Sequence, residues 1–201
     1  SVFNAGTGPR AAPGTYRVEL TVGDLSWTEP FEIIADPRVD TTPEDFRAQF
    51  ELWQRIRDKV DAVHHGVNRI RRIKRQIGEW EARTDEIQNA AGSRAETFRE
   101  SADRLKRNLS LIEGELVQAD AKTILDCLRL PDKLSNKLTT LIGVVRIADA
   151  RPPQQAYAVF DQLSSQADDQ LLKLEDLVVG DLAVFNDLLH SCELSPVSID
   201  S

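Results

Sequence analysis

The chain has 201 residues, with 33 acidic and 25 basic side chains and a formal net charge of −8 at pH 7. Hydrophobic residues make up 41% of it and glycine, with 10 residues, about 5% more, and the sum of about 46% is typical of globular domains and argues against a disordered or fibrous protein. No stretch approaches the roughly 20 apolar residues of a membrane-spanning helix, so we expect no transmembrane segment. Because the chain begins with Ser1 and shows no methionine and no signal peptide, we interpret it as a segment of a longer protein.

The first part of the chain, residues 1–38, predicts a β-hairpin. Apolar and polar residues alternate over 16–22, which is the pattern of a half-buried strand. A turn at 23–24 leads to a second strand over 27–35, where Pro30 indicates an edge strand or a bulge. An isolated hairpin is marginally stable in water. We therefore expect these strands to be the last ones of a β-sandwich whose earlier strands lie outside this chain.

From residue 42 the apolar period changes to that of a helix, and residues 42–192 predict a helical bundle. Thr42 and Pro43 provide a capping hydroxyl and a proline at the first helical position. The four predicted helices cover about residues 43–88, 94–118, 131–149 and 153–192, and a tail follows at 193–201. The apolar stripe of the first is Phe46, Phe50, Trp53, Ile56, Val60, Val63, Val67, Ile70, Ile73, Ile77, Trp80 and Ile87, and that of the second is Phe98, Ala102, Leu105, Leu109, Ile112 and Leu116.

Two packing arrangements fit these helices. At 1.5 Å per residue they are roughly 68, 38, 28 and 60 Å long, so the two short ones together match either long one. This favours a three-stranded bundle whose middle strand is broken. The alternative is an up-down-up-down four-helix bundle with a two-helix stalk. The three-stranded bundle would place the C-terminus far from the hairpin, and the four-helix bundle would place it close to the hairpin.

One group of basic residues in the first helix is a candidate anion-binding or partner-binding patch: Arg69, Arg71, Arg72, Lys74 and Arg75. Residues 151–201 carry 9 acidic and 2 basic side chains, so most of the excess negative charge lies in the last helix. We therefore favour the interpretation that the basic face meets acids of the last helix: Asp168, Asp169, Glu175 and Asp176. A nucleic-acid partner is not expected, because the chain is acidic and no aromatic residues interleave the patch.

No residue pattern predicts a metal site, a cofactor site or a catalytic centre. His64 and His65 are adjacent and point about 100° apart on a helix, and His190 stands alone, so metal-ligand spacing is lacking. Cys127 and Cys192 occur in no motif with histidine and leave the redox compartment open. The acidic pairs of the last helix lie on a helix face and not in a cleft that would desolvate one carboxyl. We expect a protein that is not an enzyme.

Several stretches together resemble a known family. The first block contains Pro13-Gly-Thr-Tyr-Arg-Val-Glu-Leu-Thr-Val22 and Asp36-Pro-Arg38 ahead of the long helix. The second contains Leu134-Ser-Asn-Lys-Leu138, Ala148-Asp-Ala-Arg-Pro152, Gln155-Ala-Tyr-Ala-Val-Phe160 and Asp181-Leu-Ala-Val-Phe-Asn186. In this combination the chain resembles the C-terminal region of large bacterial BNR-repeat, sortilin-like β-propeller proteins, which are often labelled glycosyl hydrolases.

The resemblance implies an architecture in which a propeller comes first, an immunoglobulin-like sandwich follows and a helical region ends the chain. Residues 1–38 would then be the end of the sandwich, and no catalytic residue of the family falls in this segment. Export from the cytoplasm is also implied. The expected function is that of a structural or interaction module, which braces the upstream propeller or binds another protein chain. The other chain can be a second copy of the same protein, which would give a homo-oligomer. The alternative is an accessory part of a glycan-hydrolysing or glycan-binding enzyme whose active site lies in the propeller.

Overall fold

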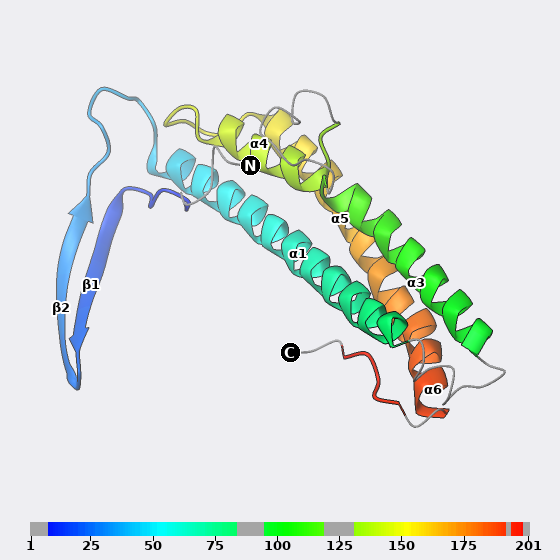
Figure 1. Cartoon of the computed structure of the whole chain (residues 1–201). Coiled ribbons are helices and arrows are strands. Elements are labelled where there is room, and N and C mark those ends of the chain that lie inside the picture. The colour runs from blue at the N-terminus through cyan, green and yellow to red at the C-terminus, as the bar shows by residue number, and fades with distance from the viewer. Residues whose placement is uncertain (1–7, 84–94, 119–130, 192–193, 199–201) are drawn as a thin grey trace. The chain divides into compact units, whose positions relative to one another are not determined.

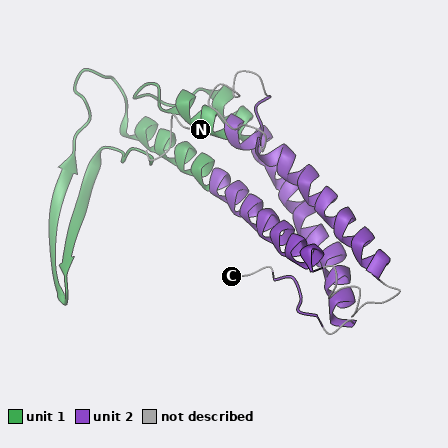
Figure 2. Ribbon diagram, in the orientation of Figure 1, with its two compact units in different colours: residues 1–58, 138–161 green, residues 59–137, 162–201 purple. Residues whose placement is uncertain are grey.

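The computed structural model of the chain describes residues 8–83, 95–118, 131–191 and 194–198 (Figure 1). Over these residues the fold is mainly α, with two long and two shorter helices preceded by an antiparallel β-hairpin, which confirms the predicted class at this level. The chain divides into two compact units, residues 1–58 with 138–161 and residues 59–137 with 162–201 (Figure 2). The elements are β1 (Gly14–Val22), β2 (Leu25–Ile33), α1 (Pro43–Ala82), α3 (Ala95–Leu116), α4 (Leu134–Val145), α5 (Gln154–Leu177), the π-helical turn η3 (Val178–Leu182) and α6 (Ala183–Ser191).

The hairpin forms as predicted, with small shifts in its bounds. Val22 pairs with Leu25 next to the turn, where Gly23 takes a φ of +60°, a left-handed conformation that glycine adopts without strain. β2 therefore starts at Leu25, before the predicted 27, and ends at Ile33. Pro30 pairs with Arg17 inside β2. A proline is tolerated there because both strands of a two-stranded sheet are edge strands.

α1 begins where its capping signal predicts. The Asp45 backbone N–H donates to Thr42 Oγ1 at 3.2 Å, and the Thr42 hydroxyl donates to Asp45 Oδ2 at 2.8 Å. These reciprocal bonds satisfy groups that an uncapped helix start would leave without partners. α1 ends at Ala82, and residues 84–88 of the predicted helix lie outside the described residues.

In the first unit, the start of α1 packs with the end of α4 and the start of α5. Arg151 Nε lies 2.7 Å from Asp45 Oδ1, and Arg55 Nη2 lies 3.2 Å from Asp161 Oδ1. From the first pair to the second, the residue numbers increase along α1 and also along the chain that leads into α5. The two helices therefore run parallel in this unit. The buried apolar side chains of this unit come from all three helices: Phe46, Leu52, Trp53, Ile56, Leu138, Leu141, Val145, Ala156 and Phe160.

In the second unit, α3 runs antiparallel to α1. Arg71 Nε lies 2.6 Å from Glu113 Oε1, and Lys106 Nζ lies 2.6 Å from Glu81 Oε2, so residue numbers fall along α3 as they rise along α1. Every apolar residue predicted for the stripe of α3 is buried, which confirms that stripe. The fully buried large side chains of this unit are Ile70, Ile73, Ile77, Leu105, Leu109, Leu116, Leu174, Leu182 and Phe185.

α5 also runs parallel to α1 in the second unit. Lys59 Nζ lies 2.7 Å from Asp168 Oδ1, and Arg69 pairs with Glu175. In an up-down-up-down bundle, the first and last helices run antiparallel. Within each unit, the parallel course of α1 and α5 is therefore the one that the three-stranded arrangement predicts and not the one that the four-helix arrangement predicts.

Besides α1, three helical segments differ from their predicted bounds, the first being α3, which ends at Leu116 and not at 118. α4 covers Leu134–Val145 and not 131–149, and at its C-terminal end the Gln49 side chain donates to the Val145 and Ala148 carbonyls, at 2.7 and 2.6 Å, in place of a further helical turn. The last helical segment was predicted for 153–192 and runs from Gln154 to Ser191. It is helical as predicted, but the π-helical turn η3 interrupts its α-helical geometry.

Candidate interaction surfaces

The basic residues predicted as a patch lie on α1 in the second unit, where their charges are bound by nearby acids. Arg69 pairs with Glu175 of α5, and Arg75 Nε lies 3.8 Å from Glu79 Oε1 one turn along α1. Arg72 also has an interaction partner. An anion-binding surface needs cations that are free to meet a ligand. The pairing of this group favours a role in holding helices together.

Glu113 of α3 is the acid that neutralises the centre of the basic group. It receives a hydrogen bond from Arg71 Nε at 2.6 Å and one from Lys74 Nζ at 3.1 Å. Its side chain is 8% exposed. Burial raises the pKa of Glu113, but the hydrogen bonds from Arg71 and Lys74 hold it below its usual range. This buried carboxylate therefore carries a negative charge that links α3 to α1.

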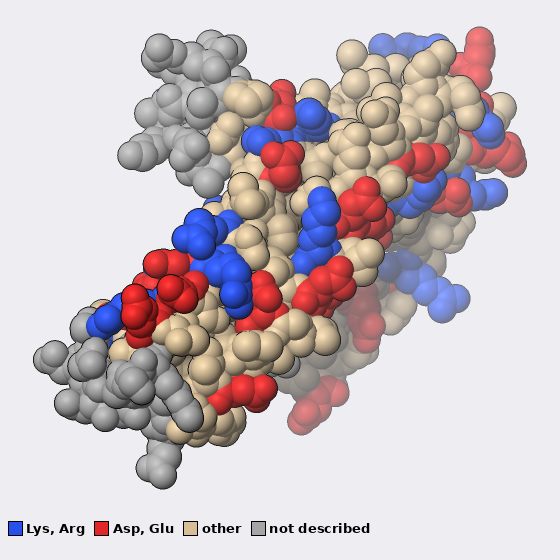
Figure 3. Space-filling view, turned by 90° about the vertical axis from the view of Figure 1, so that its right-hand side faces the viewer, with Lys and Arg blue, Asp and Glu red and all other residues tan. Residues whose placement is uncertain are grey.

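The predicted match between the basic group of the first helix and the acids of the last is confirmed for one of the four acids, Glu175, whereas Asp168 binds a lysine outside the group. Glu175 binds Arg69, and Asp168 binds Lys59. The partner that sequence reasoning missed is Glu113. It falls on the apolar stripe of α3, and an acid in a buried stripe is a signal that it has a cationic partner. On the molecular face in Figure 3, basic and acidic side chains are interspersed, as such pairing requires.

The histidines do not converge on one site. All three are exposed, and His64 Nε2 lies 3.0 Å from Ser135 Oγ. Over residues 8–83, 95–118, 131–191 and 194–198, no group of three or more histidine, cysteine or acidic side chains is placed to hold a metal. Cys127 and Cys192 lie outside this part of the chain.

The hairpin presents one mainly apolar and one polar face, and Glu29, which pairs directly with Val18, places a charge on the mainly apolar one. Directly paired residues of an antiparallel ladder point to the same side, so Leu20 shares a face with Trp27, as Tyr16 does with Phe31. Trp27 is 53% exposed, and Phe31 is 45% exposed. The exposed apolar residues on this face are Val18, Leu20, Val22, Leu25, Trp27 and Phe31. The other face carries Thr15, Arg17, Glu19, Thr21, Ser26, Thr28, Pro30 and Glu32. We call the first set the apolar face of the hairpin.

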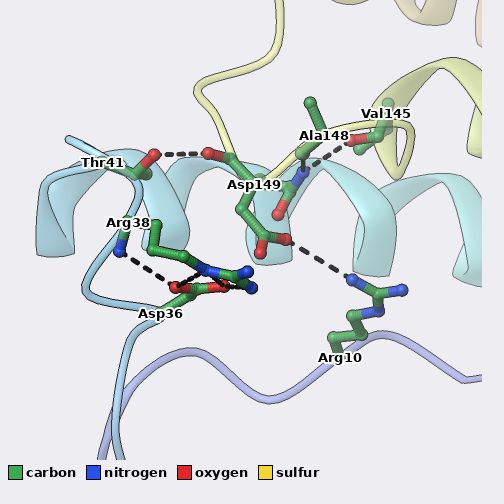
Figure 4. Close-up of polar contacts among 8 residues, drawn as sticks. Arg10, Asp36, Arg38, Thr41, Val145, Ala148 and Asp149 are labelled. Atoms are coloured by element: carbon green, nitrogen blue, oxygen red, sulfur yellow. Dashed lines mark hydrogen bonds and ion pairs between the residues drawn. The ribbon is translucent and has the colours of Figure 1, made fainter.

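The segment between the hairpin and α1 is held by polar contacts within the first unit (Figure 4). The Thr41 hydroxyl donates to the Asp149 carbonyl, and Arg10 Nη1 lies 3.4 Å from the Asp149 carboxylate. Arg38 Nε donates to Asp36 Oδ1 at 2.9 Å, and this bond lowers the pKa of Asp36. These groups bind one another, which gives them a structural role.

Two surface hollows lie in the second unit. One, of about 350 Å³, is lined mainly by polar side chains of both charges, including Glu115 and Lys133, which lie 3.2 Å apart. The other, of about 560 Å³, lies between α3 and α5 with η3 and has a largely apolar lining. Carboxylates that catalyse hydrolysis converge on one cleft with one of them desolvated. In the first hollow Glu115 is paired with Lys133, and the second hollow has acids on its rim and a mainly apolar surface.

No protein-family model, no curated protein and no solved structure matches the chain. No helix in the described part of the chain is both long enough and apolar enough to span a bilayer.

Proposed function

We propose that this chain is a non-enzymatic structural and interaction module that associates with other protein through the apolar face of its hairpin. The observation that carries the proposal is the exposure of that face. Val18, Leu20, Val22 and Leu25 are each between 55% and 62% exposed, and they adjoin Trp27. Contiguous exposed apolar surface of this kind marks protein–protein contact sites. Aromatic residues such as Trp27 and Phe31 are typical anchors of such contacts.

The partner that fits this face is another β-sheet. Two strands of nine residues each form a pleated surface, which buries its apolar side by packing face to face on a second sheet. Tyr16 and Phe31 already stack on this face, with ring centroids 5.8 Å apart, so it offers a preformed aromatic surface. The helices have their own core and supply a stable base for the hairpin.

The resemblance to the C-terminal region of sortilin-like propeller proteins supports a particular form of this proposal. In that form the hairpin completes an immunoglobulin-like sandwich in the upstream part of the same protein, and the helices form an elongated antiparallel bundle that braces the propeller outside the cytoplasm. Association with a separate chain, or with a second copy, is the other form. Both forms bury the same face of the hairpin.

Site-specific photo-crosslinking tests this proposal. A photoreactive phenylalanine analogue is placed at Leu20 or Trp27 on the apolar face, and at Thr21 or Thr28 on the polar face as matched controls. The protein is expressed in its native host and irradiated, and adducts are mapped by mass spectrometry. We expect adducts from Leu20 and Trp27 on strand residues of an upstream domain or a partner. Equal adduct yields from both faces, or none from either, would contradict the proposal.

A further inference from the structure

The largely apolar hollow between α3 and α5 has the properties of a docking groove for a helix. It has a volume of about 560 Å³ and is lined from Asn108 to Glu115 on α3 and from Gln170 to Asp181 on α5 and η3. Leu111, which lines it, is 72% exposed. Ile112 and Leu177 add apolar surface beside it. A leucine this exposed within a groove is a ready contact for a partner's apolar side chain.

The two helices that line the groove run antiparallel. Asn108 Nδ2 lies 3.4 Å from Asp181 Oδ2 at one end, and Glu115 and Gln170 line the other end. The groove extends over residues 170–181 of α5 and η3, which is about 17 Å at 1.5 Å per residue. A third helix of three turns fits between two helices in this way, with its side-chain ridges in the groove.

η3 keeps one end of the groove open. At this π-helical turn, Gly180 lines the groove, and a side chain built there would meet no atom within 4 Å. π-helical turns are rare and occur frequently at functional sites. The turn therefore leaves space where a partner side chain can enter.

The charges on the rim select the type of helix. Asp176 and Asp181 line the groove, and neither has a cationic partner among the described residues. Glu115 is neutralised by Lys133, at 3.2 Å, and Lys173 is the one cation among the described lining residues. Lys173 offsets one of the two acids Asp176 and Asp181, so the rim keeps a net charge of −1, which favours a partner with lysine or arginine beside its apolar stripe.

From these observations we infer that the groove between α3 and α5 binds a basic amphipathic helix of a partner protein. Its apolar side chains contact Leu111 and Leu177, and its lysine or arginine side chains meet Asp176 and Asp181. This site lies on the helices and is separate in sequence from the hairpin, so it does not depend on the proposed function.

Fluorescence anisotropy with designed peptides tests the inference. The probe is a labelled synthetic peptide of about 14 residues, long enough to fill the groove, with leucine on one helical face and lysine on the other. A matched peptide has glutamate in place of every lysine. We expect the lysine peptide to bind the purified chain at least about tenfold more tightly than the glutamate peptide, and less tightly as salt rises from about 50 to about 500 mM.

Paired variants locate the binding. Leu111→Ser removes the central apolar contact, and Leu172→Ser is its control, because Leu172 is 62% exposed on α5 but does not line the groove. Asp176→Asn with Asp181→Asn removes the rim charge, and Asp187→Asn is its control on exposed α6 surface. Circular dichroism checks that each variant folds. We expect each groove variant to weaken binding at least about fivefold and each control to stay within about twofold.

Three results would overturn the inference. The first is equal binding by Leu111→Ser and Leu172→Ser, which would place the peptide elsewhere. The second is equal affinity for the lysine and glutamate peptides, which would remove the role of the rim charges. The third is self-association of the chain that Leu111→Ser abolishes, which would assign the groove to a second copy.

Discussion

Gln49 provides the sharpest stability prediction, because one side chain binds two backbone carbonyls at the C-terminal end of α4. Its side chain is buried, and its Nε2 donates to the Val145 carbonyl at 2.7 Å and the Ala148 carbonyl at 2.6 Å (Figure 4). Gln49→Met keeps the volume but removes both donors. An unsatisfied buried carbonyl costs about 1–3 kcal/mol, and a partly buried one costs less because water can reach it. The apolar gain from methionine offsets part of this loss, so we expect a net loss of about 2 kcal/mol.

Urea unfolding of the purified chain measures this loss. The matched control is Gln54→Met on the same helix, where Gln54 is half-buried and has no side-chain hydrogen bond to the described residues, and we expect a change within about 0.5 kcal/mol. A Gln49→Met loss no larger than that of the control would refute the assigned role of Gln49.

Gln49→Glu adds a pH test of the same contact. The carboxylate would face two carbonyl oxygens, so its pKa in the folded state must rise. A group whose folded pKa is raised favours folding below its unfolded pKa and loses that contribution as pH rises. We therefore expect Gln49→Glu to be less stable than Gln49→Met at about pH 7 and to recover at about pH 4. A pH-independent difference between the two variants would contradict this reasoning.

Two further predictions concern the second unit. Glu113→Gln should lose about 1–2 kcal/mol at neutral pH. Because the folded pKa of Glu113 is lowered from 4.5, its contribution is present above that value and is lost as pH falls through the folded pKa. A loss of equal size at about pH 7 and about pH 3 would contradict this. The Cβ added by Gly78→Ala would meet no neighbouring atom within 4 Å, so this variant should stabilise the chain by about 0.5–1 kcal/mol. The Cβ added by Gly66→Ala would lie 2.6 Å from Leu171 Cδ2, so this variant should give no gain in stability. Thermal unfolding of the two glycine variants separates them, and an equal rise in Tm would contradict the close approach of α5 to Gly66.

The sequence was sufficient where one helix face carries one apolar stripe. The 4-3-4-3-4 spacing of α3 predicts its buried residues from Phe98 to Leu116. In α1 the prediction is less complete, because Phe50 is half-buried while Leu52 is fully buried. Two helices pack against α1 in each unit, so its buried arc is wider than a single line of residues.

The features that sequence reasoning missed depend on contacts between distant parts of the chain. Gln49 and Glu113 are polar residues whose burial requires hydrogen-bond partners, and those partners lie about 96 and 42 residues away in the sequence. The π-helical turn η3 leaves the apolar spacing of the last helix nearly unchanged, so periodicity does not reveal it. Alternation over residues 16–22 predicted the β1 side of the apolar face of the hairpin, whereas Leu25 of β2 lay outside the predicted second strand.

Oxidative footprinting of Trp27 in the native host tests the central claim most directly. Trp53 is the internal reference because it is 3% exposed, whereas Trp27 is 53% exposed. We expect fast oxidation of Trp27 in the isolated chain, and at least about fivefold protection when the protein is in its cellular assembly. Trp27 that oxidises equally fast in both settings, with Trp53 protected in both, would contradict the proposal that the apolar face of the hairpin is a docking surface.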